Sequence, residues 1–452
     1  MSNPHTNPRL VNPTGENDGK AAVLILAGHA RRPLPLDRPR IATVVDEMEL
    51  GRDRVCDSWS TDFDDPMLSR RHARLDRART GDYFVTDLGS TNGTWLDGRD
   101  LPAGKSAKLE PGAVLMLGSH VFVFRFLSHD ELAAIREDWS CPFGPVPTMS
   151  AGLAALTRKL SRLAPSNVDL LLSGETGVGK EVHAEAIHRA SGRKGPFIAI
   201  NCAAIPDTLV ESELFGYARG AHSTADRGKP GLIEQAEGGT LFLDEIGDMS
   251  QIAQTKLLRF LQSREFLALG TTRQRTLDVR VVAATNRVLG QDAADVNTDV
   301  GLRPDLAARL GPEPIVLPPL RERPEDVGLL AAFFAKTELE FVPEAFQALF
   351  LHSWKGNVRE LEKVIALARV LAGEGAAIAL PHLPMPMAAR AKTDAMPTKP
   401  LAPRKRPTRD ELRTLLARHG GDVAQLAREI GRQRTLVWRW LRENELRPDD
   451  YR

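Results

Sequence analysis

An apolar segment, a glycine-rich loop and a helical segment follow one another near the middle of the chain, and this order constrains the fold most strongly. Val168–Leu172 is typical of a buried strand, and Glu181–Arg189 has the pattern of a helix. Between them Gly174–Lys180 fits the phosphate-loop pattern G-x-x-x-x-G-K in the strand–loop–helix context that it requires. Glycines let backbone N–H groups turn around a β-phosphate, while the lysine ammonium neutralises phosphate oxygens. The nucleotide-binding residues predicted here are Gly174, Glu175, Thr176, Gly177, Val178, Gly179, Lys180 and Glu181.

Two carboxylates follow a second apolar segment, Leu241–Leu243. At the carboxyl edge of a parallel sheet, Asp244 would hold Mg²⁺ through water and Glu245 would polarise the attacking water. Glu181 stands where the strict phosphate-loop pattern has Ser or Thr, so the usual hydroxyl ligand for the metal is missing. A third strand ends at Asn286, which is positioned to sense a γ-phosphate.

Patterning divides the chain into three folded parts. Residues 20–128 contain short alternating apolar segments that are broken by turns. This pattern predicts an all-β sandwich. Residues 148–383 alternate strands with helices, which predicts an α/β fold with a parallel sheet covered on both faces. Residues 384–407 are rich in Ala, Pro, Lys and Arg and predict a linker, and residues 408–452 return to helical periodicity and predict a small all-α domain.

The middle part resembles the AAA+ domain, with its helical lid, of bacterial enhancer-binding proteins that activate sigma-54 RNA polymerase. The resemblance implies a homo-oligomer, from dimer to hexameric ring, with ATP and Mg²⁺ at subunit interfaces. It implies that Asn201 engages Glu245 in a nucleotide switch, that Arg303 and Arg309 are arginine fingers for a neighbouring protomer, and that Arg359 is the second sensor. The segments that carry the resemblance are Gly174–Glu181, Phe197–Ala204, Glu213–Gly220, Gly238–Asp248, Leu317–Asp326 and Trp354–Glu362.

One loop departs from this family. The family sequence G-A-F-T-G-A, whose Phe and Thr press on sigma-54, is replaced by G-A-H-S-T-A at Gly220–Ala225. The changed contact residues are His222, Ser223 and Thr224. Imidazole buries less apolar area than phenyl, and threonine lacks the backbone freedom of glycine. Two interpretations remain open: tolerated drift with activation intact, or weakened or lost engagement of sigma-54.

Three polar clusters in the β-rich part resemble the forkhead-associated domain: Leu50–Arg52, Leu68–Ala73 and Asp87–Thr94. In that family the Arg and Ser hold the phosphate of phosphothreonine, a role that suits a guanidinium and a hydroxyl. The resemblance implies a phosphothreonine protein as partner, a serine/threonine kinase or its substrate, and a structural role for His72. The phosphopeptide-binding residues implied are Arg52, Ser69, Arg70 (or Arg71), Thr91 and Asn92.

The tail is locally basic. From Arg404 to Arg452, 13 Lys/Arg stand against 8 Asp/Glu, a net charge of +5 in a chain whose formal charge is +1. A first helix around Leu412, a second capped by Asp422 and a third after Gly431 resemble the Fis-type helix-turn-helix of enhancer-binding proteins, which implies dimeric binding to palindromic double-stranded DNA. The expected packing residues are Leu436, Val437, Trp438 and Leu441. The expected DNA contacts are Arg432, Arg434, Thr435, Arg439 and Arg442.

Composition excludes several classes of protein. Hydrophobic residues make up 42% and charged residues 26%, as in ordinary globular chains. The apolar run Ala21–Ala27 is far too short to span a membrane, and Cys56, Cys141 and Cys202 lack metal-ligand spacing. We therefore expect a reduced, cytoplasmic protein without a membrane partner.

The sequence favours a transcriptional regulator that senses phosphothreonine, binds DNA and remodels a sigma-54 promoter complex with ATP. The first alternative is a DNA-binding repressor or sigma-54 antagonist that binds ATP without activating. The second is a remodelling ATPase with no promoter role.

Overall fold

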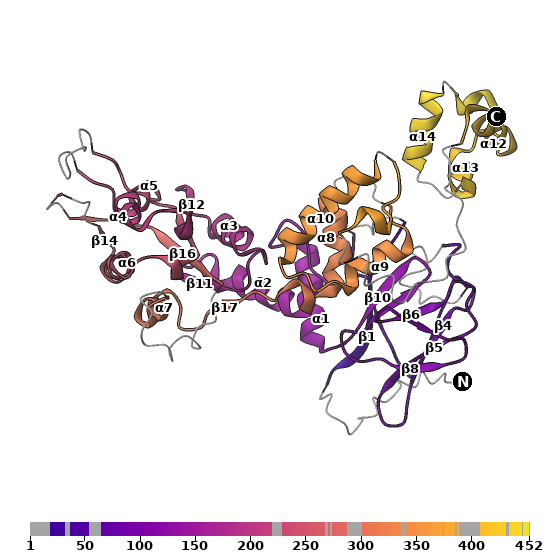
Figure 1. The fold of residues 1–452 in the computed structure, drawn as a ribbon, viewed down its shortest axis with the longest axis horizontal. Helices are drawn as coiled ribbons and strands as arrows, with labels where there is room; N and C mark the ends of the chain where they lie inside the picture. Colours follow the sequence, from indigo (N-terminus) through magenta and orange to yellow (C-terminus); the bar gives the residue numbers. More distant parts are fainter. Residues whose placement is uncertain are drawn as a thin grey trace, which may run out of the picture. The chain divides into compact units, whose positions relative to one another are not determined.

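A computed structural model of the chain (Figure 1) describes residues 19–31, 37–53, 65–218, 228–266, 270–271, 274–286, 301–335, 340–373, 375–384, 387, 407–430, 434–444 and 446–451. The chain divides into two compact units, Met1–Met396 and Pro397–Arg452. The first unit contains the strand-rich part, the α/β part and a helical lid. The predicted linker lies almost entirely outside the described residues.

The strand-rich part is an antiparallel sandwich, as the sequence predicts. A six-stranded sheet in the order β2-β1-β10-β9-β6-β7 faces a four-stranded sheet in the order β3-β4-β5-β8. Leu24, Leu115, Phe122 and Phe124 are among the buried residues between the two sheets. The strands are β1 (Ala21–His29), β2 (Ile41–Thr43), β3 (Glu47–Leu50), β4 (Ala73–Arg77), β5 (Tyr83–Asp87), β6 (Thr94–Leu96), β7 (Arg99–Leu101), β8 (Ser106–Lys108), β9 (Val114–Leu117) and β10 (His120–Leu127).

Strand β1 of the larger sheet is buried on both faces, which corrects the expected alternation. Along β1, Leu24 and Leu26 point into the sandwich, whereas Val23 and Ile25 pack against helices on the other side. All residues of β1 after Ala21 are buried. A strand covered on both faces carries a continuous apolar run, and this explains the sequence of β1.

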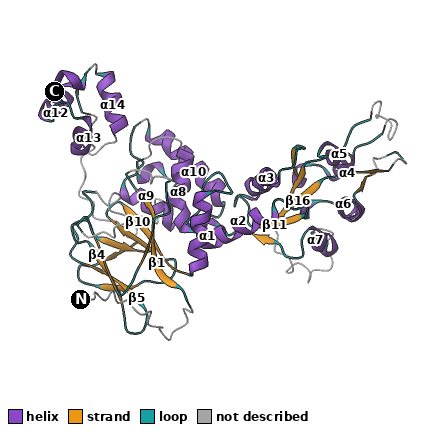
Figure 2. Cartoon of the chain, turned by 180° about the vertical axis from the view of Figure 1, so that it is seen from behind, coloured by secondary structure: helices purple, strands orange, loops and turns teal. Residues whose placement is uncertain are grey.

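The α/β part is built on a five-stranded parallel sheet in the order β12-β13-β16-β11-β17. Its faces are covered by α3 on one side and by α6 and α7 on the other (Figure 2), and each face has its own apolar core. The strands are β11 (Leu170–Ser173), β12 (Phe197–Asn201), β13 (Thr240–Asp244), β16 (Arg280–Thr285) and β17 (Ile315–Val316), with a separate hairpin of β14 (Glu265–Phe266) and β15 (Arg275–Thr276).

Local sequence signals explain where the helices of this part begin. Ser128 and Glu131 form a capping box on α1, Ser250 caps α6, and Pro304 is the first residue of α7. The helices are α1 (His129–Ser140), α2 (Ala151–Leu163), α3 (Lys180–Ser191), α4 (Asp207–Phe215), α5 (Leu232–Gln235), α6 (Gln251–Ser263) and α7 (Pro304–Leu310), with short 3-10 turns η2 (Cys202–Ala204) and η3 (Ile246–Asp248).

The lid follows the sheet and shares one apolar core with the sandwich. This core joins Ala27, Trp95 and Val121 of the sandwich to Phe346 and Leu361 of the lid. The lid elements are η5 (Leu320–Glu322), η6 (Pro324–Asp326), α8 (Val327–Ala335), α9 (Pro343–Leu351), α10 (Asn357–Ala372) and η7 (Leu380–His382).

The second unit contains α12 (Arg409–Arg418), α13 (Val423–Ile430), α14 (Arg434–Glu443) and η8 (Pro448–Tyr451). Its core includes Leu412, Leu416, Leu426, Val437 and Leu441. Among the helices of the described ranges, none combines the length and apolar character needed to cross a bilayer.

Candidate functional site

The glycine-rich loop lies between β11 and α3, where the sequence predicts it. Gly174, Gly177 and Gly179 have φ of 153°, 78° and 109°, a region that L side chains rarely adopt. A Cβ atom at Gly177 would also lie 2.3 Å from the carbonyl oxygen of Gly356 in the lid. Glycine at this position is therefore required by both the loop conformation and the approach of the lid.

Lys180 begins α3 and is 6% exposed. Its ammonium donates to the carbonyl oxygens of Gly174 (2.8 Å) and Glu175 (3.4 Å), and lies 3.6 Å from Oε1 of Glu245. The cation is thus held inside the loop and beside a carboxylate, where it can neutralise phosphate oxygens.

The carboxyl ends of β13 and β16 meet the loop. Glu245 follows β13 with φ of 52°, and its Oε2 accepts from the N–H of Asn286 at 3.0 Å. The side-chain amide of Asn286 lies 3.4 Å from the hydroxyl of Thr176. Asp244 accepts from the N–H of Glu245 through Oδ1 at 3.1 Å. The structure therefore brings together a cation, two carboxylates and an amide at one sheet edge.

Two lid residues that sequence reasoning missed bind the loop. Arg321 donates to Glu175 at 2.7 Å, and Asn357 donates to the same carboxylate and to the carbonyl of Thr176, each at 3.1 Å. These hydrogen bonds, that of Arg321 above all, lower the pKa of Glu175. Both residues lie in segments that carry the AAA+ resemblance, which was the available signal.

The backbone of the lid also contacts the loop. The N–H groups of Val358 and Arg359 point to the carbonyl of Gly177 at 3.0 and 3.3 Å. The side chain of Arg359 is exposed on this side of the lid. On the opposite side of the loop, His183 lies in α3, and its Nδ1 is 2.8 Å from the carbonyl oxygen of Gly179. Burial lowers the pKa of His183 to about 4, so the ring is neutral and Nδ1–H donates.

Three residues predicted to act in the nucleotide switch or across protomers make other contacts within this chain. The Asn201 side chain accepts from the N–H of Ala203 at 3.0 Å and caps a turn. Arg303 binds Asp305 at 2.7 Å, and Arg309 donates to the carbonyl of Leu261 at 2.9 Å. Their roles stay predictions.

His222, Ser223 and Thr224 lie outside the described residues. The base of their loop is a small antiparallel bridge in which Tyr217 and Lys229 exchange backbone hydrogen bonds of 3.0 and 2.9 Å. An ion pair of 2.6 Å between Lys229 and Glu213 reinforces it.

The predicted phosphopeptide residues converge at one end of the sandwich. The N–H of Arg52 donates to the carbonyl of Ser69 at 3.0 Å, and the Ser69 hydroxyl accepts from the N–H of Thr91 at 3.0 Å. Asn92 donates to the carbonyl of Met67 at 2.8 Å. Arg52, Arg70 and Thr91 are exposed. Loops from three strand pairs thus place a hydroxyl, amides and guanidinium groups on one surface.

Buried polar residues hold these loops from below. His72 is fully buried, accepts from the N–H of Ser69 at 3.1 Å and lies 3.0 Å from the carbonyl of Gly93, which agrees with the structural role expected of it. Burial lowers its pKa. Asp87 binds the N–H groups of Gly89 and Ser90. Burial raises the pKa of Asp87, but its hydrogen bonds outweigh burial and lower it.

The C-terminal helices agree with the sequence in part. Asp422 caps α13 by accepting from the N–H of Gln425 at 3.1 Å. Val437 and Leu441 are buried as expected, but Trp438 is 42% exposed and Trp440 is buried in its place, because Trp440 follows Val437 by three residues on the inward face. Among the expected DNA contacts, Arg439 and Arg442 are exposed on α14; Arg432 and the side chains of Arg434 and Thr435 lie outside the description. The helix-turn-helix assignment stays a prediction.

Three protein families match the chain. The sigma-54 interaction domain matches residues 146–315, the AAA+ ATPase lid domain residues 321–400 and the FHA domain residues 48–118. These matches confirm the sandwich and the AAA+ assignments.

Individual relatives extend the similarity. The transcriptional regulatory protein ZraR of Klebsiella oxytoca is 37% identical over 68% of this chain and 70% of its own length. The regulatory protein LuxO of Vibrio cholerae is 44% identical over 52% of this chain and 46% of its own length. The crystal structure of NtrX from Brucella abortus in complex with ATP is 30% identical, covers 69% of this chain and 72% of its own, and has a TM-score of 0.49.

The chain spans 36–48% of the length of several curated relatives, so their activities do not transfer to it directly. The match to ZraR covers more than two thirds of that protein, and it extends beyond the sigma-54 interaction domain into the lid. The chain therefore belongs to the family of transcriptional regulators that carry a sigma-54 interaction domain, and it combines this domain with an FHA domain.

Proposed function

We propose that the chain is a transcriptional regulator that hydrolyses ATP to remodel a sigma-54 promoter complex. The observation that carries the proposal is the meeting of Lys180, Glu245 and Asn286 at the edge of the parallel sheet, under a lid that binds the phosphate loop. A cation, a carboxylate and an amide in this arrangement suit phosphoryl transfer.

The residues divide the chemistry between them. Glu245 accepts a proton from a water molecule while the oxygen of that water attacks the γ-phosphorus. The bond between this phosphorus and the oxygen of the departing ADP breaks. Lys180 stabilises charge on the phosphate oxygens, while the N–H of Asn286 fixes the orientation of the Glu245 carboxylate. Asp244 offers the kind of oxygen donor that Mg²⁺ prefers and would hold the ion through water, and the bound ion would neutralise charge on the phosphates.

Assembly would complete this site. Arg303 immediately precedes α7 and is partly exposed, and Arg309 lies on α7 and is exposed. In a homo-oligomeric ring, a neighbouring protomer would supply these guanidinium groups to the γ-phosphate, because a planar cation suits charge spread over equatorial oxygens.

The flanking parts would direct this activity. The exposed Arg52 and the Ser69 hydroxyl would hold a phosphothreonine phosphate, and Asn92 would grip the peptide backbone. The exposed Arg439 and Arg442 of α14 would contact double-stranded DNA. A phosphorylated kinase or kinase substrate is the partner that this chemistry fits.

The changed loop supports a second candidate function. With His222, Ser223 and Thr224 in place of the family residues, the chain would bind DNA and ATP but repress or antagonise sigma-54 transcription instead of activating it.

Transcription in vitro with sigma-54 holoenzyme separates the two functions. Open complexes that depend on ATP and on this chain support activation. No open complex at saturating protein, with intact hydrolysis, supports the antagonist. The variant His222→Phe/Thr224→Gly restores two family residues and should then produce open complexes.

A further inference from the structure

The sandwich is packed directly onto the AAA+ lid. A Cβ atom added to Gly28 in β1 would lie 2.5 Å from Cζ of Phe346 in α9, and one added to Gly328 in α8 would lie 2.2 Å from the carbonyl oxygen of Ala27. Only glycines permit this approach of strand and helices. The FHA domain is therefore a structural neighbour of the lid, not a module tethered at a distance.

An ion pair crosses the same boundary. Arg125 in β10 donates to Glu325 and to the carbonyl of Glu322, each at 2.8 Å. Glu325 is 3% exposed, and its burial raises the pKa to about 7 against the opposing effect of Arg125. A carboxylate so deeply buried depends on its cation, so this contact ties β10 to η6.

Hydrogen bonds lead from the predicted phosphopeptide surface into the sandwich. Asn92 donates to the carbonyl of Met67 at 2.8 Å, and the N–H of Met67 donates to Oδ1 of Asp65 at 3.0 Å. The other carboxylate oxygen of Asp65 accepts from the N–H of Ser119 at 3.2 Å. Asp65 thus bonds the phosphopeptide loop to the turn between β9 and β10.

The same series continues into the lid. The N–H of Ala30 donates to the carbonyl of Ser119 at 2.8 Å, and the N–H of Phe341 in the lid donates to the carbonyl of Ala30 at 2.6 Å. Five hydrogen bonds therefore connect Asn92 to Phe341 without a gap.

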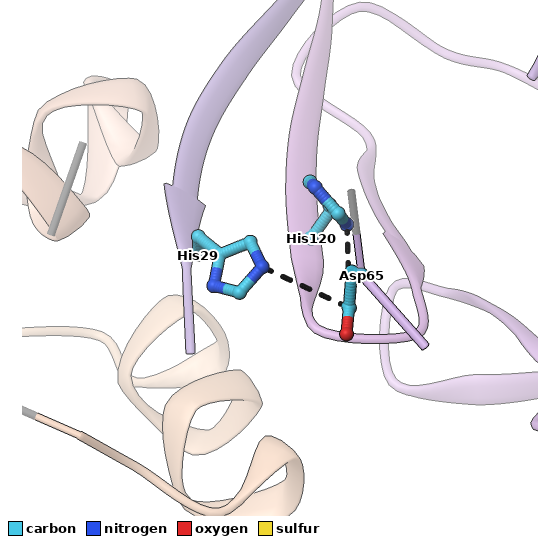
Figure 3. A group of neighbouring side chains, drawn as sticks. All are labelled: His29, Asp65 and His120. Atoms are coloured by element: carbon cyan, nitrogen blue, oxygen red, sulfur yellow. Dashed lines mark ion pairs between the residues drawn. The ribbon is translucent and has the colours of Figure 1, made fainter. Parts of the chain in front are cut away.

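Two buried histidines lie beside Asp65 in this series. Figure 3 shows His29 and His120 beside Asp65, and their ring nitrogens lie 3.7 and 3.8 Å from its Oδ2. Two His and one Asp could also ligate zinc. Because Nδ1 of His29 accepts from the N–H of Arg31 at 3.1 Å, Nε2 of a neutral ring carries the hydrogen. Nε2 of His29 therefore presents a hydrogen and not a lone pair to Asp65, which disfavours a metal site.

The lid carries the connection to the nucleotide loop. Phe341 and Phe346 share a core with Trp354, which lies three residues before α10. Immediately after Trp354, the lid backbone and Asn357 bind the loop at Gly177 and Thr176. A shift of the lid core would thus move groups that touch the phosphate-binding loop.

We propose that phosphopeptide occupancy at Asn92 is transmitted to the nucleotide site through Asp65, Phe341 and the lid. This inference rests on the proposed function of both sites. A peptide that favours the loop arrangement bonded to Asp65 also favours the lid arrangement bonded to the phosphate loop, so the coupling is positive. By linkage, nucleotide raises peptide affinity by the same factor.

The test measures the dissociation constant of a fluorescent ADP analogue with the full-length protein. The dissociation constant is measured without peptide, with a peptide mixture that carries a phosphothreonine at a fixed position, and with the same mixture unphosphorylated. We expect the phosphorylated mixture to lower the constant at least about fivefold in the wild type. Asp65→Asn replaces one acceptor by a donor and should reduce the effect to less than about twofold.

Two further variants keep the result interpretable. Asp82→Asn removes an exposed FHA carboxylate that binds Thr80 and Lys108, and it should keep the full effect. The Cβ atom of Gly28→Ala would force β1 and Phe346 of the lid apart without altering the phosphopeptide loop. This variant should therefore bind the phosphorylated mixture but lose the coupling.

Each contrary outcome has a distinct meaning. Coupling retained in both Asp65→Asn and Gly28→Ala would overturn the route, as would a wild type that binds peptide with unchanged ADP affinity. Equal binding of phosphorylated and unphosphorylated mixtures would overturn the phosphothreonine function, and the coupling with it, while ADP binding by the wild type would still stand.

Discussion

The two loops proposed to hold phosphate in this chain are built in different ways. Between β11 and α3 the loop is shaped by glycine backbone, with the lysine at its end. At the end of the sandwich, the side chains of Ser69 and Asn92 tie two loops together, and Asp87 holds the turn of one of them. A buried histidine supports each loop, His183 in one and His72 in the other. The backbone therefore forms the nucleotide loop within the seven residues Gly174–Lys180. The phosphopeptide surface draws its residues from the 41-residue range Arg52–Asn92.

The largest expected effect separates the two loops. Lys180→Ala removes the buried cation, so ATP affinity should fall about 100-fold or more, because a phosphate then loses its charged partner. Binding of a phosphothreonine peptide, measured without nucleotide, should not change. Equilibrium titration with a fluorescent ATP analogue tests this, with Lys159→Ala on the exposed face of α2 as control. ATP affinity within threefold of the wild type would contradict the assignment.

The reverse experiment removes a guanidinium from the sandwich. Arg52→Ala should weaken phosphothreonine peptide binding about 30-fold, since a charge-assisted hydrogen bond to phosphate is lost. Fluorescence anisotropy with a phosphorylated peptide mixture measures it. Arg74→Ala, an arginine paired with Asp76 within β4, is the matched control and should bind normally. Equal losses in both variants would show that the surface charge matters and not the site.

Breaking the ion pair between the sandwich and the lid should give the next largest effect. Arg125→Ala leaves Glu325 buried without its cation and should lower the free energy of unfolding by about 2 kcal/mol, reduced from a fully buried pair because Arg125 is partly exposed. The raised pKa of Glu325, about 7, sets the sign with pH. The unpaired carboxylate is penalised only when charged, so the loss should be larger at pH 8 than at pH 5.5. Urea unfolding at the two pH values tests this, and an equal loss at both would contradict it.

The smallest effect compares the two histidines. His183 has a pKa of about 4 when folded and 6.5 when unfolded, so the unfolded chain binds more protons as pH falls below 6.5. From pH 7.5 to 5.5 this should cost about 1 kcal/mol of stability. The glutamine of His183→Gln does not titrate, so over the same pH change this variant should lose about 1 kcal/mol less stability than the wild type. His72 also has a lowered pKa, so His72→Gln should change the pH dependence in the same direction. If the free energy of unfolding changed equally with pH in the wild type and in His183→Gln, the lowered pKa of His183 would be contradicted.

Much of the nucleotide site could be predicted because its signal is local. The spacing of Gly174, Gly179 and Lys180 and the carboxylates after an apolar strand stand in the sequence as contiguous patterns. The lid contacts of Arg321 and Asn357 could not be derived in this way, because they reach Glu175 from 146 and 182 positions away along the chain.

The junction of sandwich and lid was also beyond sequence reasoning. The sequence pattern predicted alternating segments, whereas β1 is buried on both faces, and nothing in its sequence indicates that the lid is part of the cover. The error at Trp438 has a simpler cause: a ten-residue helix offers too few turns to fix its inward face without a view of its neighbours.

Turnover by the Glu245→Gln variant tests the central claim most directly. The variant keeps an oxygen that can accept from the N–H of Asn286 but cannot take a proton from water. At protein concentrations that allow assembly and with Mg²⁺ present, we expect ATP to bind with wild-type affinity and phosphate release to fall about 100-fold or more. Phosphate release at the wild-type rate would contradict the claim that this sheet edge hydrolyses ATP.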